Sequence, residues 1–276
     1  MFGPLKWKHL ILCRRAGLSV LLVATLLLAG PAVAAGGPAV FPWREGRIES
    51  FRYSIERAGH KVGEIEQVLY GDKDVHGGRR YRAVVELIRQ TQVGEDRSVM
   101  GRFTSEVFFG LDSMDFIERL DNFARGDTEG RSHTVRTPSG LKITSESMSS
   151  AIGRPPVEQT MPLDGTEPVV DKLALTYFIR TLPHEKGYAF HINTVIPLEK
   201  VVDRLAGEVG PEQDLLWHGS SIRVRRIEVA SARGTGSYFV AADAQHRLIR
   251  FVSRTQEVYD LLPAGEEPDA GSDGSR

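Results

Sequence analysis

The sequence predicts a mainly β domain: a curved antiparallel sheet or partly closed barrel, with one principal helix packed on it. Three observations predict this fold class. Apolar and polar residues alternate with a period of two, turn residues separate the alternating segments at short intervals, and one segment breaks the alternation. Many short strands joined by regular turns are typical of an antiparallel sheet that curves or closes.

The first predicted element is a hairpin. Apolar Phe51, Tyr53 and Ile55 alternate with polar residues, a turn follows over residues 58–61, and the chain resumes from Val62. The same pattern predicts strands over residues 81–93, 99–109, 115–123, 132–136, 141–145, 188–196, 222–229, 238–242 and 248–258. The link Thr-Pro-Ser-Gly at 137–140 suits a tight turn, because proline brings its fixed φ to that position.

The segment that breaks the alternation predicts the principal helix, over residues 171–180. Asp171 is a suitable N-cap, and Pro183 follows the end of the segment. The proline-containing stretches 155–156 and 162–168 precede the helix, and we expect them to form a surface loop that crosses the sheet.

Residues 1–34 predict a cleavable secretory signal peptide. Four basic residues and no acidic one occur before a short apolar run, and Ala32 and Ala34 supply small residues at the spacing of a cleavage site. The apolar run is about a dozen residues, against the roughly 20 that span a membrane. Cys13 precedes this run and therefore does not serve as a lipid-attachment site. We expect a periplasmic or secreted protein with no transmembrane anchor after cleavage.

The rest of the chain predicts one domain. Residues 35–46 are expected to be a linker, residues 47–263 a single β-rich domain, and residues 264–276 a disordered acidic tail. Without residues 1–34, which hold four basic and no acidic residues, the formal net charge falls from −1 to −5. This charge argues against nucleic acid as a partner, since nucleic-acid binders are usually basic overall or in clusters.

Three stretches of the chain resemble an exported bacterial family, domain of unknown function 3108. They are Tyr53 with the turn from Gly59 to Gly63, the predicted helix 171–180 with Gly187, and the turn at Asp243 that leads into Leu248-Ile249-Arg250. The resemblance implies an antiparallel β domain reminiscent of periplasmic lipoprotein carriers. It brings no catalytic residues with it.

Local motifs point to no catalytic residues, metal or cofactor. Ser139 to Lys142 matches S-x-x-K, but it lies in a turn and a strand rather than on a helix. Residues 72–77 begin like a calcium loop, but Ala83 stands where the bidentate glutamate belongs. Arg223, Arg225 and Arg226 form the densest basic run. They predict either a patch for an anionic partner or a solvated face balanced by Glu228 and Glu257, and we favour the solvated face.

These observations leave three classes of function open. The first is a non-catalytic binding or carrier domain of the cell envelope, whose partner is a lipid or other apolar small molecule. The second is a structural or assembly factor that binds an envelope protein through its surface, and the third is an enzyme of unrecognised type. For the carrier we expect a hollow between helix and sheet, lined by Leu173 and Tyr177, with Arg180 at its rim and Trp217 as the opposite wall.

Overall fold

A computed structural model describes residues 41–92, 98–126, 128–147, 155–163 and 168–263. The chain divides into two compact units, Met1–Val33 and Ala34–Arg276, and the described residues all belong to the second. The expected signal peptide, the first part of the expected linker and the expected acidic tail lie outside the described residues.

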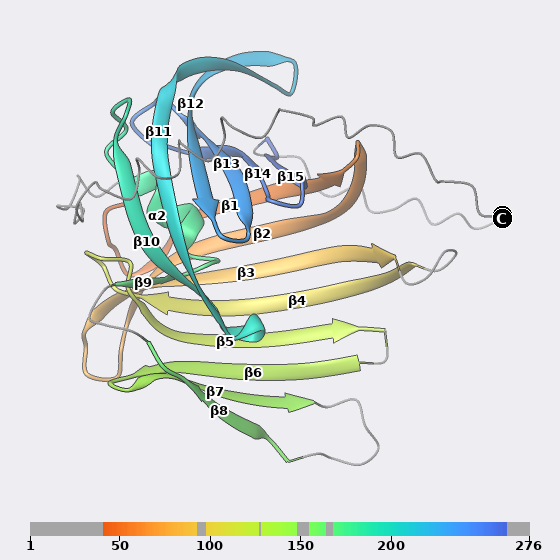
Figure 1. Cartoon of the computed structure of the whole chain (residues 1–276), viewed down its shortest axis with the longest axis vertical. Coiled ribbons are helices and arrows are strands. Elements are labelled where there is room, and N and C mark those ends of the chain that lie inside the picture. The colour runs from red at the N-terminus through yellow and green to blue at the C-terminus, as the bar shows by residue number, and fades with distance from the viewer. Residues whose placement is uncertain (1–40, 93–97, 127, 148–154, 164–167, 264–276) are drawn as a thin grey trace, which may run out of the picture. The chain divides into compact units, whose positions relative to one another are not determined.

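The strands of the described residues form one large curved sheet that does not close (Figure 1). Its order, from one edge to the other, is β8 (Val157–Met161), β7 (Gly140–Ser147), β6 (Thr128–Thr137), β5 (Phe116–Arg125), β4 (Ser98–Phe109), β3 (Arg79–Gln92), β2 (His60–Lys73), β1 (Gly46–Arg57), β15 (Val258–Leu261), β14 (Leu248–Val252), β13 (Gly234–Ala241), β12 (Ser220–Ser231), β11 (Val201–Trp217), β10 (Ala189–Ile196) and β9 (Val169–Asp171). The mainly β fold class that the alternation predicts is therefore confirmed.

Short turns fix the register of neighbouring strands. Consecutive strands from β1 to β8 lie side by side and antiparallel. Between β1 and β2 and between β6 and β7, a two-residue turn reverses the chain direction. The predicted turn at 137–140 closes β6 against β7, with Thr137 opposite Gly140. The edge strand β9 runs parallel to β10, which is a departure from the antiparallel expectation.

Strands β8, β9 and β11 lie outside the predicted strands, and the predicted strand 248–258 is divided into β14 and β15. Strand β11 contains Gly207, Gly210 and Pro211, which argue against a strand interior. The structure accommodates the proline at a register shift between Val209 and Glu212, and the Phe190 ring covers Gly207. Strand β8 lies between the two proline-containing stretches, 155–156 and 162–168, that were expected to form a surface loop.

The principal helix is shorter than predicted. Helix α2 spans Leu175–Thr181, and its N-cap is Ala174 rather than Asp171. Asp171 instead ends strand β9, where its carboxylate accepts a hydrogen bond from the backbone N–H of Leu173 at 2.7 Å. The carboxylate therefore caps the turn before the helix, and the helix begins four residues later than Asp171.

The core lies on the inner face of the sheet, which we define as the face that packs against α2. In Figure 1, β10 and β11 pass in front of the strands β1–β5, and α2 lies behind β10 and β11. Helix residues and residues of both halves of the sheet belong to one continuous apolar cluster. Phe190 and Phe178 meet there with ring centroids 5.9 Å apart.

Side chains tie the edge strand β9 to the inner face of β5. Arg119 of β5 donates to both oxygens of Asp171, at 3.2 and 3.0 Å. The same guanidinium donates to Asp121 at 2.8 and 3.0 Å, and Asp115 accepts from the backbone N–H of Val169 at 2.8 Å. Because Arg119, Asp121 and Asp171 are all buried, these ionic contacts form a lock in the interior.

Candidate functional site

Of the residues expected to line a hollow under the helix, Tyr177 is part of the packed core. Its side chain is 1% exposed, and its ring stands 6.0 Å from Phe41 and 6.1 Å from Phe109. Burial raises the pKa of the Tyr177 hydroxyl well above its ordinary value. Leu173 lies in the turn before α2 and packs against the same cluster.

Arg180 lies in the interior rather than at a rim. Its side chain is 3% exposed, and its guanidinium donates to Glu49 at 3.0 Å and to the carbonyl of His246 at 2.8 Å. The rings of Phe41 and Phe51 lie 5.1 and 4.9 Å from the cationic carbon. The expected exposed cation is therefore a buried one that the protein's own groups already bind.

Trp217 lies at the end of β11 and contacts strand β15. Its indole N–H donates to the carbonyl of Leu261 at 2.8 Å, and its ring meets that of His218 edge-on. The structure thus brings Leu173, Tyr177 and Arg180 together around α2, while Trp217 is anchored to β15.

The basic run on β12 is balanced by acidic neighbours. Arg223 lies 3.1 Å from Asp214, Arg225 pairs with Glu212, and Arg226 pairs with Glu228. Glu257, which was expected to balance this face, is instead buried and pairs with Arg57 and Arg89. The arginines form a solvated face in ion pairs.

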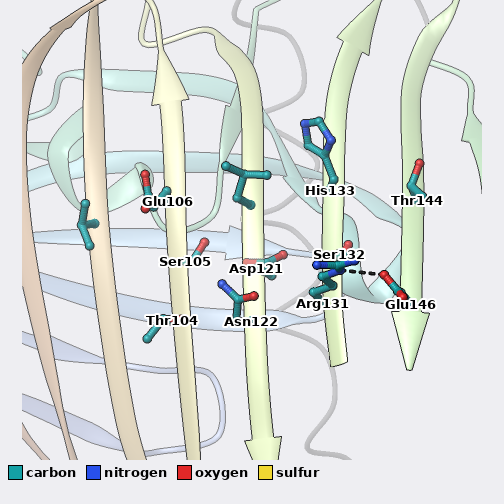
Figure 2. Close-up of a pocket in the computed structure, with 12 residues that line it drawn as sticks. Thr104, Ser105, Glu106, Asp121, Asn122, Arg131, Ser132, His133, Thr144 and Glu146 are labelled. Atoms are coloured by element: carbon teal, nitrogen blue, oxygen red, sulfur yellow. Dashed lines mark hydrogen bonds and ion pairs between the residues drawn. The ribbon is translucent and has the colours of Figure 1, made fainter. Parts of the chain in front are cut away.

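A groove crosses the outer face of β4–β7, on the side away from the core (Figure 2). We call it the outer groove. Its volume is about 460 Å³, within the roughly 300 to 1,000 Å³ that is usual for small-ligand sites. A smaller hollow of about 350 Å³ continues it and shares Thr104 and Asn122 with it.

Two rows of outward side chains border the outer groove. Each row consists of residues directly opposite one another on neighbouring strands, since outward residues recur with a period of two and the register aligns them. The first row is Thr104, Asn122, Arg131 and Glu146, and the second is Val84, Glu106, Leu120, His133 and Thr144. The backbone of Ser105, Asp121 and Ser132 forms the floor, and the side chains of these three are buried.

The charged side chains of the outer groove are paired. Arg131 donates to Glu146 at 2.6 Å, and His133 lies 2.7 Å from Glu118. Glu106 lies 3.2 Å from Arg82. The groove therefore carries no strong excess of either charge, and its hydrogen-bonding groups are held in defined directions by their partners.

The uncharged polar groups of the groove are open to a ligand. Asn122 is exposed and offers both a donor and an acceptor, and Thr104 and Thr144 offer hydroxyls from either row. None of the three side chains is bonded to another side chain within the described ranges. Leu120, 36% exposed, places an apolar surface between these polar groups.

Arg119 and Asp121, two members of the buried ion-pair network, lie beneath the floor of the groove and have shifted pKa values. Burial raises the pKa of the Asp121 carboxyl, against the opposing effect of Arg119. Burial also opposes the charge on Arg119, but the carboxylates of Asp171 and Asp121 outweigh it and raise the pKa of that guanidinium. These charges point inward, so the groove has polar walls over a floor whose charged side chains face the core.

No local pattern in the sequence pointed to the outer groove. Its residues alternate with inward-facing residues on five strands, β3 to β7, and they come together only once the register is known. The short turns between these strands are the signal that could have found it, because a turn of fixed length sets which residues lie opposite each other.

The chain was compared with known families, curated proteins and solved structures. No family model matches the chain, so the resemblance to domain of unknown function 3108 stays a prediction, and no curated protein matches it either. One similar solved structure is the beta-barrel-like protein of domain of unknown function DUF1849 from Brucella abortus. The two chains are 10% identical, with a TM-score of 0.49, and the match covers 79% of this chain and 97% of that chain.

In the part of the chain that the structure describes, no helix combines the length and apolar character needed to cross a membrane.

Proposed function

We propose that the protein is a non-catalytic binding domain of the cell envelope that holds an uncharged, hydroxyl-rich ligand, an oligosaccharide, in the outer groove. The observation that carries the proposal is the groove itself: two cross-strand rows of mainly polar side chains, one of which contains the exposed Leu120. The signal peptide that the sequence predicts over residues 1–34 supports a periplasmic or secreted location.

The charge pattern of the groove supports an uncharged ligand. Arg131 is paired with Glu146 and Glu106 with Arg82, so a charged ligand would meet a group of its own sign beside each group of the opposite sign. A sugar instead carries hydroxyls, each of which is both donor and acceptor, and the groove supplies both kinds of partner through Asn122 and the paired charges. The apolar face of a sugar ring fits against Leu120.

The packing under α2 supports the groove over an apolar hollow. An acyl chain would need the space that Tyr177 and Phe109 occupy, and both side chains are fully buried in contact with each other. The cation of the helix is also engaged, since Arg180 is bound by Glu49.

Calorimetric titration of the purified protein with three probes tests the ligand class. The probes are a neutral trisaccharide such as cellotriose or chitotriose, an acidic trisaccharide of galacturonic acid, and lauric acid. We expect the neutral sugar to bind at least about tenfold more tightly than the acidic one, a difference of about 1.4 kcal/mol, and lauric acid not to bind. Binding of lauric acid, or no binding of any neutral trisaccharide at millimolar concentration, would overturn the proposal.

A matched pair of variants locates the binding site. Arg131→Ala removes a cation from the groove, while Arg223→Ala removes an exposed, paired arginine from β12. We expect the first to weaken sugar binding and the second to leave it unchanged. Equal losses in both variants would contradict a site in the outer groove.

A further inference from the structure

The two edges of the sheet differ in how they are covered. Edge strand β9 is buried along its whole length and locked to β5. Edge strand β8 pairs with β7 on one side, and its residues from Val157 to Thr160 are exposed. A strand edge that lies open presents unpaired backbone N–H and C=O groups, which can pair with another chain.

The backbone groups that face the open edge belong to Glu158 and Thr160. Thr137 and Gly140 close the two-residue turn between β6 and β7, so the backbone groups of Gly140 point to β6. Backbone direction alternates along a strand, and Leu141 therefore points to β8, where it lies opposite Met161. By the same alternation the groups of Glu158 and Thr160 point away from β7.

The usual protection against edge pairing is weak on β8. Natural edges are commonly blocked by an unpaired charge or by proline within the strand. The one charged residue of the strand, Glu158, is paired with Lys142 of β7 at 3.0 Å. Prolines stand on either side of the strand, at 155–156 and 162, rather than inside it. A window of five residues is left open.

We propose that this edge is a docking site for a second copy of the chain, with the two β8 strands antiparallel about a two-fold axis at Gln159. In this register Val157 of each copy lies opposite Met161 of the other, on the inner side of the joined sheet. On the outer side, Glu158 lies opposite Thr160. Apolar residues thus meet apolar ones, and no like charges face each other.

The prolines exclude the neighbouring registers. An axis at Glu158 would place that carboxylate opposite its own copy and Thr160 opposite Pro156. An axis at Thr160 would place Glu158 opposite Pro162. Proline has no N–H to give to the ladder, so only the axis at Gln159 pairs all outward backbone groups.

The contact is small, and the dimer is accordingly weak. Five residues from each strand bury much less than the roughly 1,200 Å² of a stable interface. We therefore expect self-association only at high micromolar to millimolar protein concentration, and sedimentation equilibrium measures it in that range.

Charge substitutions at Thr160 test the register. Thr160→Glu places like charges opposite each other twice per dimer, and Thr160→Lys places opposite charges there. At about 0.2 to 1 kcal/mol per cross-strand pair, we expect up to about thirtyfold weaker association for the first and a comparable strengthening for the second. The two substitutions should have the opposite effects on the stability of the monomer, because residue 160 lies opposite Lys142 of β7. Glutamate at position 160 should stabilise the monomer, and lysine should destabilise it.

Two further variants complete the experiment. Thr160→Pro removes an outward N–H without taking a bond from the β7 ladder, and it should abolish association. Thr235→Glu adds the same charge at an exposed position on β13 and should leave association unchanged, with circular dichroism checking that each variant is folded. A protein that stays monomeric at millimolar concentration, or Glu and Lys variants that shift association in the same direction, would overturn the proposal.

Discussion

The inner and outer faces of β4–β6 are built from alternate residues of the same strands. They differ in how far their side chains are buried and in what covers them. On β5, Arg119 and Asp121 point inward and are buried in ion pairs, whereas Leu120 and Asn122 point outward and are exposed. The inner face is filled by α2, β9 and their neighbours, while the outer face is open over the groove.

The difference shows where this fold keeps its interior closed and where it has room for a ligand. A curved sheet with one helix suggests a carrier with a hollow centre, yet aromatic side chains fill the space under the helix. Phe41, Tyr81, Phe109 and Tyr177 form a connected cluster there. Polar side chains free to bind a ligand instead gather on the outer face.

The largest expected effect comes from breaking the interior lock. Arg119→Ala leaves the carboxylates of Asp121 and Asp171 buried without their cation, and we expect it to lower the free energy of unfolding by about 3 to 5 kcal/mol. Urea unfolding followed by circular dichroism measures the loss. A variant within about 0.5 kcal/mol of the wild type, the usual range for surface changes, would show that these buried ion pairs do not hold β9 against β5.

Replacing Tyr177 of α2 by alanine tests whether side chains fill the space between the helix and the sheet. Tyr177→Ala should cost about 3 to 5 kcal/mol, as for other buried aromatics. Tyr177→Phe should be neutral or slightly stabilising, because the buried hydroxyl makes no hydrogen bond among the described residues. A small loss for the alanine variant, with protein that gains affinity for lauric acid, would restore the hollow-core interpretation.

The stacked histidines near α2 give the interior a pH dependence. His184 lies on His246 with ring centroids 4.0 Å apart, and burial, followed by the charge of His246, lowers the pKa of His184 to about 4. The fold favours the neutral ring. The stability that the neutral His184 ring contributes to the fold is therefore fully present above the ordinary histidine pKa of about 6.5. It is lost as the pH falls toward 4.

We expect this titration to remove about 2 to 3 kcal/mol of stability in the wild type between pH 7 and pH 4. His184→Phe keeps an aromatic ring on His246 but does not titrate. Between pH 7 and pH 4 the stability of this variant should therefore fall by about 2 to 3 kcal/mol less than that of the wild type. Parallel pH profiles for the two proteins, measured by urea unfolding, would contradict the assignment to His184.

Most of the fold was predictable because strand alternation and turns are local properties. The first hairpin and the turn at 137–140 follow directly from their residues. The long strand β11 was missed because Gly207 and Pro211 weaken the local signal, and what stabilises that strand is not local. The Phe190 ring covers the glycine, and a register shift accommodates the proline.

The candidate site was less predictable than the fold, for the same physical reason. Asp171 has the local features of an N-cap, but Arg119, distant in sequence, binds its carboxylate and holds it at the end of β9. Arg180 was expected at a rim, yet Glu49 and two phenylalanine rings enclose it. The groove likewise depends on pairing between strands, which no single segment of the sequence reveals.

Changes in the groove should have the smallest effect on stability. Asn122→Ala and Arg131→Ala remove exposed side chains, and we expect each to change the free energy of unfolding by no more than about 0.5 kcal/mol. Thermal unfolding followed by circular dichroism measures this change. A loss of several kcal/mol would mean that the outer face is structural rather than free to bind.

The most direct test of the central claim compares sugar binding in two double variants that alter opposite faces of the same strands. Thr104→Ala with Asn122→Ala changes the outer groove, and Ser105→Ala with Ser132→Ala changes the buried side chains beneath its floor. Calorimetry with the neutral trisaccharide should show at least about tenfold weaker binding for the outer pair and an unchanged dissociation constant for the inner pair. Loss of binding in the inner pair with retention in the outer pair would contradict the account and place the ligand inside the sheet.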